Sequence, residues 1–424
     1  MAEPPYLGDY RRNIGQPVKA AGLAFVKLPG APWHQRQSLK NIVAALDGQD
    51  GMVRFVGGAV RDSLLGLPVQ DIDLATILKP DDVMARLSKA GIKVIPTGIG
   101  HGTVTAITRD GPVEITTLRR DVSTDGRRAT VAYSDDWKED AARRDFTINA
   151  LSADPETLEI YDYFGGLEDL ENRHIRFIGS ARQRIAEDHL RIMRYFRFLA
   201  RFAETRVDDE AYAACTQAAE SLHSLSRERI ADELMKLLVT ANPAFAVGKM
   251  LDAGIFDHVF AGAESEAAAQ LDRLVNREQA YSIPPVAIRR LITLLPKDVD
   301  KAGKIVTGLK SSKKMRRGVM DRLTAQEPAA ADMPVLAYHY GAEAAQDIAL
   351  LFAADDDLAA CMEALDGWQK PVFPITGGDL IAMGLEPGPI VTKTLAKVEQ
   401  AWIDEGFPDE ERVTQLARES ISPD

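Results

Sequence analysis

A change in residue pattern near position 165 limits the possible folds of this 424-residue chain more than any other feature. Before that position, short β-rich or apolar runs such as 53–57, 72–77 and 103–108 alternate with helical patterns such as 80–90. After it, apolar residues recur at helical spacing and strand signals are few. The chain is also too long for one compact core. We therefore predict an α+β protein, with a mixed sheet and helices in the first domain and helices alone afterwards.

Glycine and proline residues indicate where the domains end. Gly165-Gly166 is typical of a hinge after the mixed domain, and Pro371 with Gly377-Gly378 precedes a last helical segment. Inside the first domain, the polar and irregular stretch 119–136 is typical of a mobile loop. We expect four domains, here named head, neck, body and tail, at residues 1–166, 167–240, 241–370 and 371–424.

The charge distribution restricts where nucleic acid could bind. Taken alone, the net charge of −12 argues against nucleic acid as a partner. Arginines nevertheless crowd into 119–128, 143–144 and 182–201. A local basic strip on an acidic protein could hold RNA with strong sensitivity to salt.

The cysteines and the apolar runs bear on location. Cys215 and Cys361 lack the spacing of metal ligands and fit buried thiols in a reducing compartment. No apolar run reaches the ~18 residues of a membrane span, and the first residues do not read as a secretory signal. We therefore expect a cytoplasmic protein without a membrane segment, and no obligate protein partner is evident.

The first chemical signal is the segment FVGGAVRD at 55–62. Gly57 and Gly58 lie where a strand turns into a helix, so their backbone N–H groups could approach a triphosphate closely. Arg61 falls one turn into that helix, near enough to pair with phosphate oxygens. A pair of glycines alone is more often an ordinary turn.

The second part of the signal is DIDLA at 71–75. Asp71 and Asp73 flank one residue of a predicted strand, and the two-residue period of a strand points both carboxylates to one face. Such ligands suit Mg²⁺, and two ions ~3.5–4 Å apart would serve nucleotidyl transfer. Glu114, on a following strand, is a candidate third carboxylate, although an ordinary exposed strand residue is equally consistent with the pattern.

The combination of Gly-Gly, Arg and Asp-x-Asp is far more specific than either part alone. It resembles the catalytic signature of the nucleotidyltransferase superfamily that contains DNA polymerase β. The version here resembles class II CCA-adding enzymes and bacterial poly(A) polymerases. This resemblance implies a polymerase-β-like head domain, with Asp71 and Asp73 as catalytic metal ligands. Glu114 is a further catalytic candidate from its position on the following strand alone.

Two downstream segments could select a nucleotide. In RRDFTINAL at 143–151, Arg144 could donate to ribose or phosphates, and Asp145 could orient Arg144. Thr147 and Asn149 could contact the sugar, but they fit a helix cap equally well. The segment 184–202 has helical periodicity throughout, so we predict one continuous helix.

On that helix, Asp188, Arg191 and Arg194 are spaced three apart and would share one stripe. A carboxylate and a guanidinium can read cytosine and adenine, which both carry an amine beside a ring nitrogen acceptor. By itself the helix fits a salt-bridged surface helix better. In the resembled family this motif selects the nucleotide, which implies Asp188 and Arg191 as base readers and contacts from Arg194 and Arg197.

The remaining motifs continue the resemblance to about residue 236. LSRERIADELMK at 225–236 resembles the next family motif, in which Glu228, Arg229 and Glu233 would brace the selecting helix. The segment 375–406 resembles the tail of bacterial members, which implies tRNA binding by body and tail. The basic run 308–317 could touch RNA phosphates, although a solvated helix face is the more common explanation.

The resemblance implies a CTP/ATP:tRNA nucleotidyltransferase that builds the 3′-terminal CCA of tRNA and releases pyrophosphate. A poly(A) polymerase, or an enzyme that adds only C or only A, is the alternative that the motifs leave open. A catalytically inactive RNA-binding protein is disfavoured by the intact Asp71, Asp73 and Arg61. The stretch 119–136 is a candidate element for switching from CTP to ATP; its arginines are Arg119, Arg120, Arg127 and Arg128.

Overall fold

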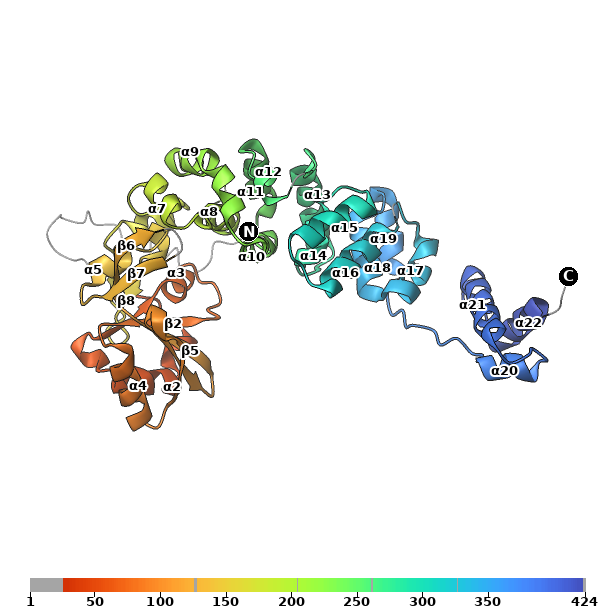
Figure 1. Ribbon diagram of the computed structural model, residues 1–424, viewed down its shortest axis with the longest axis horizontal. Coiled ribbons are helices and arrows are strands. Elements are labelled where there is room, and N and C mark those ends of the chain that lie inside the picture. Colours follow the sequence, from red (N-terminus) through yellow and green to blue (C-terminus); the bar gives the residue numbers. More distant parts are fainter. Residues whose placement is uncertain (1–25, 126–127, 204, 261, 326, 422–424) are drawn as a thin grey trace. The chain divides into compact units, whose positions relative to one another are not determined.

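The computed structural model describes residues 26–125, 128–203, 205–260, 262–325 and 327–421, with side chains undescribed within 121–131. The N-terminal segment and Arg127, considered above, therefore lie outside the described residues, as does the side chain of Arg128. The chain divides into two compact units, Met1–Val259 and Phe260–Asp424. Figure 1 labels the helices and strands.

A mixed sheet forms the centre of the head, as the sequence predicts. Its seven strands lie in the order β3-β4-β5-β2-β1-β8-β9. The pair β2 and β5 is parallel, whereas the other neighbours are antiparallel. The strands are β1 (Val53–Val56), β2 (Ile72–Thr76), β3 (Lys93–Gly98), β4 (Thr103–Thr108), β5 (Gly111–Thr117), β8 (Ser152–Ala153) and β9 (Ile160–Tyr161).

Short helices pack around this sheet. Helix α4 begins at Pro80 with Asp81 and Asp82 in its first turn, where a fixed φ and negative charge both favour a helix start. The head helices are α2 (Gln37–Ala45), α3 (Gly58–Leu64), α4 (Pro80–Lys89), α5 (Trp137–Ala142) and α6 (Gly166–Glu171).

The stretch 119–136 is more regular than the sequence suggested. It contains a second, two-stranded sheet formed by β6 (Arg119–Asp125) and β7 (Arg128–Tyr133). The antiparallel register pairs Arg119 with Tyr133. The polar composition concealed these strands, although Asp125-Gly126 is a common hairpin dipeptide.

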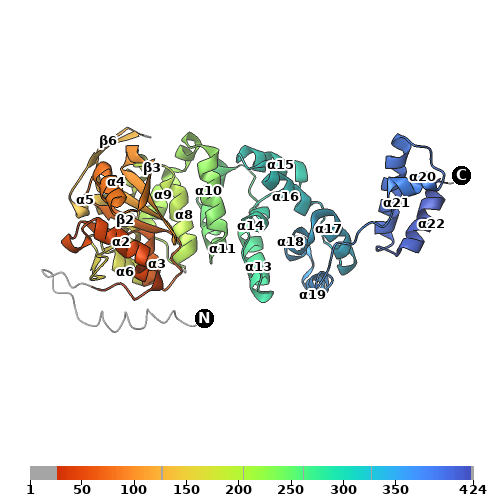
Figure 2. The same cartoon turned by 90° about the horizontal axis from the view of Figure 1, so that it is seen from below.

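The helices after the head pack on α8. Figure 2 shows α8, α10 and α11 side by side, and their contacts agree. Ile192, Phe196 and Leu199 of α8 are fully buried. These helices are α7 (Ala181–Glu187), α8 (Arg191–Phe202), α9 (Asp209–Gln217), α10 (Arg227–Leu238), α11 (Pro243–Asp252) and α12 (Phe256–Val259).

The prediction of one helix over 184–202 is wrong. Helix α7 ends before Asp188, whose backbone is extended (φ −150°, ψ 107°), and α8 begins at Arg191. The Asp188 carboxylate accepts the backbone N–H of Leu190 at 3.1 Å. An aspartate that binds a nearby backbone N–H competes with the helix hydrogen bonds, which explains the break. Asp188 therefore does not share a helical stripe with Arg191 and Arg194.

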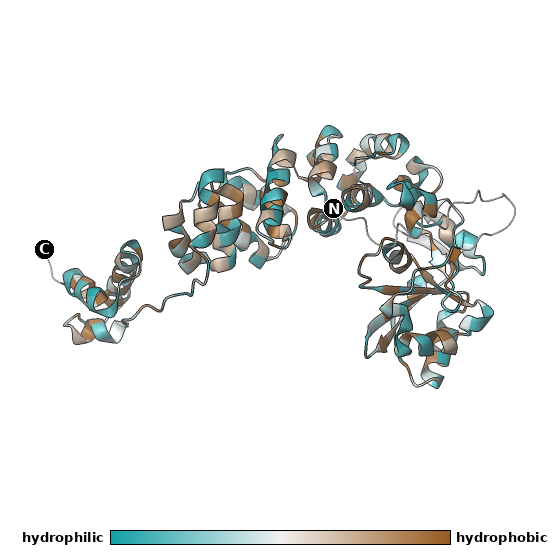
Figure 3. Ribbon diagram, turned by 180° about the vertical axis from the view of Figure 1, so that it is seen from behind, coloured by the Kyte–Doolittle hydropathy of each residue, from teal (hydrophilic) through white to brown (hydrophobic). Residues whose placement is uncertain are grey.

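All regular elements among the described residues of the second unit are helices, as predicted. One core joins α13 with α17–α19, and another joins α17 with the last three helices around Trp402. Figure 3 shows hydrophilic and hydrophobic residues on both α21 and α22, as expected for helices with one buried face. None of the described helices is long and apolar enough to cross a membrane. The helices are α13 (Ala267–Ala280), α14 (Ala287–Ile292), α15 (Val299–Gly308), α16 (Lys313–Leu323), α17 (Met333–Tyr340), α18 (Ala342–Phe352), α19 (Asp355–Glu363), α20 (Gly377–Ala382), α21 (Pro389–Asp404) and α22 (Glu410–Ile421).

Candidate active site

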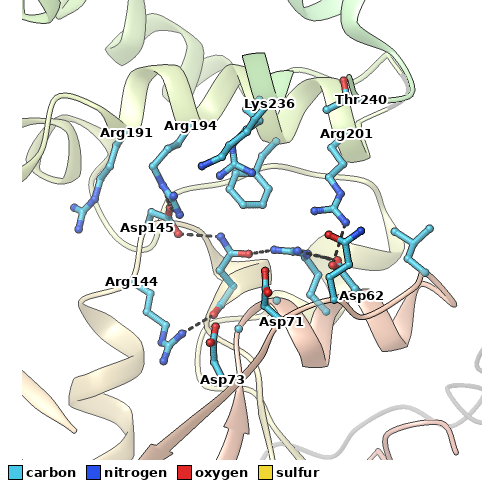
Figure 4. Close-up of a pocket in the computed structure, with 18 of the residues that line it drawn as sticks. Asp62, Asp71, Asp73, Arg144, Asp145, Arg191, Arg194, Arg201, Lys236 and Thr240 are labelled. Atoms are coloured by element: carbon cyan, nitrogen blue, oxygen red, sulfur yellow. Dashed lines mark hydrogen bonds and ion pairs between the residues drawn. The ribbon is translucent and has the colours of Figure 1, made fainter. Parts of the chain in front are cut away.

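A cleft of about 1150 Å³ in the first unit contains most of the residues that the sequence singled out (Figure 4). Its walls come from α3, the segment before β2, residues 143–149, α8 and α10. Nine basic and five acidic residues line it, so the cleft is locally basic in a chain of net charge −12. Such a site suits a polyanionic ligand. The predicted residues in its lining are Gly57, Gly58, Arg61, Asp71, Asp73, Arg144, Asp188, Arg191, Arg194 and Arg197.

The glycine turn allows a close approach between the strand end and residues 144–149. Gly57 has φ +65°, and a Cβ there would lie 3.1 Å from an Arg144 nitrogen. The Gly57 N–H donates to the carbonyl of Leu151 at 3.1 Å, so this N–H is already bonded. The turn thus positions β1, α3 and Arg144 around the cleft.

Asp71 and Asp73 both line the cleft, on either side of the buried Ile72. Asp71 directly precedes β2 and is exposed, whereas Asp73 lies within β2 and is partly buried. Burial, Glu114 and Asp71 together raise the pKa of Asp73 to about 6, against the lowering effect of Arg144. A carboxylate that repels its neighbours in this way fits a site that a divalent cation would stabilise.

Glu114 stands beside Asp73 in the register of the parallel strands β5 and β2. Its side chain is exposed, and it does not belong to the lining of the cleft. Among the described residues, no group of three or more His, Cys, Asp or Glu side chains is arranged to hold a metal ion. The geometry therefore places Asp71 and Asp73 in the cleft, with Glu114 close enough to influence the pKa of Asp73.

Arg61 is buried at the back of the cleft. It donates to Asp62 at 2.8 Å and to the Asn149 side chain at 2.5 Å, and its guanidinium lies over the ring of Phe202. Burial lowers the pKa of Arg61, although Asp62 partly offsets this effect. These contacts connect α3 to residues 147–149 and to α8.

The pairing of Arg144 and Asp145 differs from the sequence expectation. Arg144 pairs with Asp140 of α5 at 3.3 Å, so Asp145 does not orient it. Asp145 instead accepts from Arg194 at 2.6 Å and from Asn149 at 2.9 Å. Burial opposes ionisation of Asp145, but the charge of Arg194 and these hydrogen bonds keep its pKa below the usual value. Asp145 therefore links the head to α8.

The side chains before and within α8 are held in ion pairs. Arg229 of α10 donates to both carboxylate oxygens of Asp188, at 3.0 and 3.3 Å. Arg191 pairs with Glu187 at 2.5 Å and also donates to the carbonyl of Arg143 at 3.2 Å. These contacts align the predicted base readers without occupying all their hydrogen-bonding groups.

Two of the three predicted braces on α10 contact the expected segment, whereas Glu228 is exposed. Glu233 is buried and accepts from Arg197 at 2.6 Å, and Arg229 holds Asp188, so both contact the expected segment. Sequence reasoning missed Asp62, which joins Arg61 to Arg201 of α8 at 3.0 Å. The signal was available, because Asp62 completes the FVGGAVRD segment and Arg201 extends the arginine series of α8.

Comparisons with known proteins give a consistent result. Residues 53–176 match the family model "Poly A polymerase head domain", and residues 206–266 match "Probable RNA and SrmB- binding site of polymerase A". The human protein "CCA tRNA nucleotidyltransferase 1, mitochondrial" is 32% identical over 381 residues, covering 88% of this chain and 87% of that protein. The "CCA-adding enzyme" of Streptococcus uberis is 32% identical, covering 82% of this chain and 88% of that protein.

Solved structures agree with these sequence matches. The Bacillus stearothermophilus CCA-adding enzyme in complex with CTP superimposes with a TM-score of 0.72 and 26% identity, over 91% of this chain and 98% of that one. The Thermotoga maritima CCA-adding enzyme complexed with tRNA_CCA has a TM-score of 0.66 at 21% identity, over 94% and 99% of the two chains, and supports the fold alone.

Proposed function

We propose, because this chain belongs to the family of CCA-adding enzymes, also named CCA tRNA nucleotidyltransferases, that it adds or repairs the 3′-terminal CCA of tRNA from CTP and ATP. The observation that carries the proposal is the presence of Asp71 and Asp73 in one cleft with the arginines of α8. The matched head domain spans 53–176 and therefore includes Asp71 and Asp73, whereas the arginines of α8 lie after it.

The reaction joins two substrates at the two aspartates. The oxygen of the RNA 3′-hydroxyl forms a bond to the α-phosphorus of the nucleoside triphosphate, and the hydroxyl proton is released. The bond between the α-phosphorus and the bridging oxygen breaks, and pyrophosphate leaves. The arginines that line the cleft bind the triphosphate and stabilise the charge on its oxygens.

The two carboxylates of Asp71 and Asp73 would hold divalent cations, which we take to be Mg²⁺ because their ligands are oxygens. When bound, such ions activate the attacking hydroxyl and neutralise charge on the leaving group. Mg²⁺ held by these two side chains would take water and phosphate oxygens as its other ligands. Glu114 is a further candidate for a catalytic role, because it lies beside Asp73 in the register of β2 and β5.

Asp188 and Arg191 select the nucleotide. The carboxylate accepts from the exocyclic amine of cytosine or adenine, and the guanidinium donates to the adjacent ring nitrogen. Uracil and guanine present a carbonyl instead, which leaves acceptor facing acceptor at a cost of about 1–3 kcal/mol. Arg194 and Arg197 remain proposed nucleotide contacts, through the donors that their ion pairs leave available.

The four-domain division and the cytoplasmic location also stay predictions.

One assay tests the proposed function and its alternative. Purified protein is incubated with Mg²⁺ and tRNA that ends at the discriminator base, after C or after CC, with CTP and ATP supplied separately and together. Termination at CCA is the expected result. A long ladder of A residues would instead identify a poly(A) polymerase, and extension by one base type alone would identify a C-only or A-only enzyme.

A further inference from the structure

One amide side chain in the wall of the cleft joins arginines from two different helices. Asn149 ends the short 3₁₀ helix Thr147–Asn149 and is 8% exposed. Its side-chain oxygen accepts from Arg61 at 2.5 Å, and its side-chain N–H donates to Asp145 at 2.9 Å. Asp145 in turn accepts from Arg194 at 2.6 Å. These four side chains form a continuous hydrogen-bond row from α3 to α8.

The chemistry of the two neighbours explains an amide at position 149. A guanidinium only donates hydrogen bonds and an ionised carboxylate only accepts them, whereas an amide accepts at one end and donates at the other. An aspartate here could accept from Arg61 but would place a second carboxylate against Asp145. A leucine would leave both neighbours with one partner fewer, at positions that are only 5% and 8% exposed, where a lost hydrogen bond is costly.

Ion pairs anchor both ends of the hydrogen-bond row. Arg61 pairs with Asp62 at 2.7 Å, and Arg194 pairs with Asp145 at 2.5 Å. Figure 4 shows Asp62 on one side of the cleft and Asp145 with Arg194 on the other. Removal of the Asn149 amide would therefore leave two separate ion pairs, with no hydrogen bond through position 149 to fix one relative to the other.

The two ends of the row serve different parts of one nucleotide in the proposed reaction. Arg61 follows the glycine turn and would contact the triphosphate, whereas Arg194 belongs to the helix that would contact the base. Transfer requires the α-phosphorus to lie at Asp71 and Asp73 while the base lies against α8. The distance between the two arginines must therefore be fixed for the nucleotide to be aligned.

We propose that Asn149 is a positioning residue that fixes the triphosphate and the base relative to each other. It acts through Arg61 on one side and through Asp145 and Arg194 on the other. The inference rests on the proposed function, because a ligand that is bound at both ends of the row is what needs this alignment.

Steady-state kinetics of Asn149→Leu test this role, with a tRNA that ends at the discriminator base as substrate. The variant removes both hydrogen bonds of the amide. We expect kcat for addition of C to fall by about 10- to 100-fold, because a misplacement of about 1 Å can cost about 100-fold. The KM for CTP should change much less, because the arginines at both ends of the row keep their ion pairs. A raised KM for CTP at unchanged kcat would overturn the positioning role.

Base selectivity provides a second readout. The ratio of kcat/KM for CTP to that for UTP should fall in Asn149→Leu, because a base whose phosphates can shift is no longer held against its reading groups. This fall should be smaller in an Asp145→Asn background, since the hydrogen-bond row is already weakened there. Equal falls in the two backgrounds would show that Asn149 does not act through Asp145, against the proposal.

Thr117→Val is the matched control. Thr117 is buried in the head and donates to the carbonyl of Leu78 at 2.8 Å, but it does not line the cleft. Its loss should lower stability in urea denaturation and leave kcat and selectivity unchanged. Equal losses of kcat in Thr117→Val and Asn149→Leu would reduce the role of Asn149 to general support of the head and overturn the proposal.

A second variant guards against misfolding of the first. Asn149→Asp keeps an acceptor for Arg61 but loses the donor to Asp145, and it should show the same fall in kcat and selectivity. Unchanged kcat in a folded Asn149→Asp would contradict the proposal. Failure of the proposed function would look different, because the wild type would then add no nucleotide to any RNA, and the positioning role would fail with it.

Discussion

The cleft of the first unit and the segment 297–317 of the second unit are both rich in basic residues, yet they use them differently. In the cleft, arginines are fixed by partners, as Arg194 is by Asp145 and Arg197 is by Glu233. The segment 297–317 has eight basic residues and two acidic ones, on α15, α16 and the turn between them. Lys310, Lys313 and Lys314 are exposed and form no ion pair with any residue that the structure describes.

This difference separates two tasks that positive charge can perform. A guanidinium held by a buried carboxylate has a fixed orientation, which selection of a base or a phosphate oxygen requires. An exposed lysine on a flexible stem supplies attraction without orientation, which suits binding along an RNA backbone. We therefore expect geometry to dominate in the cleft and total charge to dominate in the segment 297–317.

The largest effect is expected at the metal-binding carboxylates. Asp71→Ala should reduce nucleotide incorporation by at least about 10³-fold, because metal ions stabilise the transition state by several kcal/mol. Binding of RNA and thermal stability should change little, since Asp71 is exposed. Asp82→Ala, which removes an exposed carboxylate from the first turn of α4, serves as the control for lost negative charge. Full activity of Asp71→Ala would remove the metal site from the mechanism.

The next largest effect concerns stability. Glu233→Ala leaves Arg197 without its partner in a largely buried position, so we expect a loss of about 3–5 kcal/mol in the free energy of unfolding. Asp321→Ala in α16 removes the partner of Arg317, whose side chain is 85% exposed, and should have little effect. Urea denaturation measures both. Similar losses for the two variants would show that the cleft pairs are no more important structurally than the exposed ones.

The two regions also differ in how far the sequence could predict them. The two-residue period of a strand was enough to place Asp71 and Asp73 on one face, because that rule depends only on local geometry. The break at Asp188 was missed, because the apolar period continues across it while a side-chain hydrogen bond interrupts the backbone. The partner of Asp145 could not be predicted either, since Arg194 lies 49 residues away and only the fold brings them together.

A smaller effect is expected for the segment 297–317. Replacing Lys310, Lys313 and Lys314 by Ala should raise the KM for full-length tRNA by about tenfold and reduce its dependence on salt concentration. Activity on a short RNA hairpin with the same 3′ end should not change, because in this hypothesis only full-length tRNA contacts the segment. The control replaces three exposed lysines of the head, Lys79, Lys89 and Lys93. An equal effect on both RNAs, or an equal effect of the control, would contradict a separate RNA-binding role for this segment.

The smallest effect is the response of stability to acid. Because Arg194 and its hydrogen-bonded neighbours hold the pKa of Asp145 below its value in the unfolded chain, ionised Asp145 stabilises the fold above about pH 4. This contribution is lost as the pH falls through the lowered pKa of the folded state. Asp145→Asn should therefore be less stable than the wild type at neutral pH, and the difference should shrink as the pH falls below 4. Thermal unfolding between pH 3 and pH 7 measures this, and a difference that stays constant over that range would show that the charge of Asp145 does not hold α8 against the head.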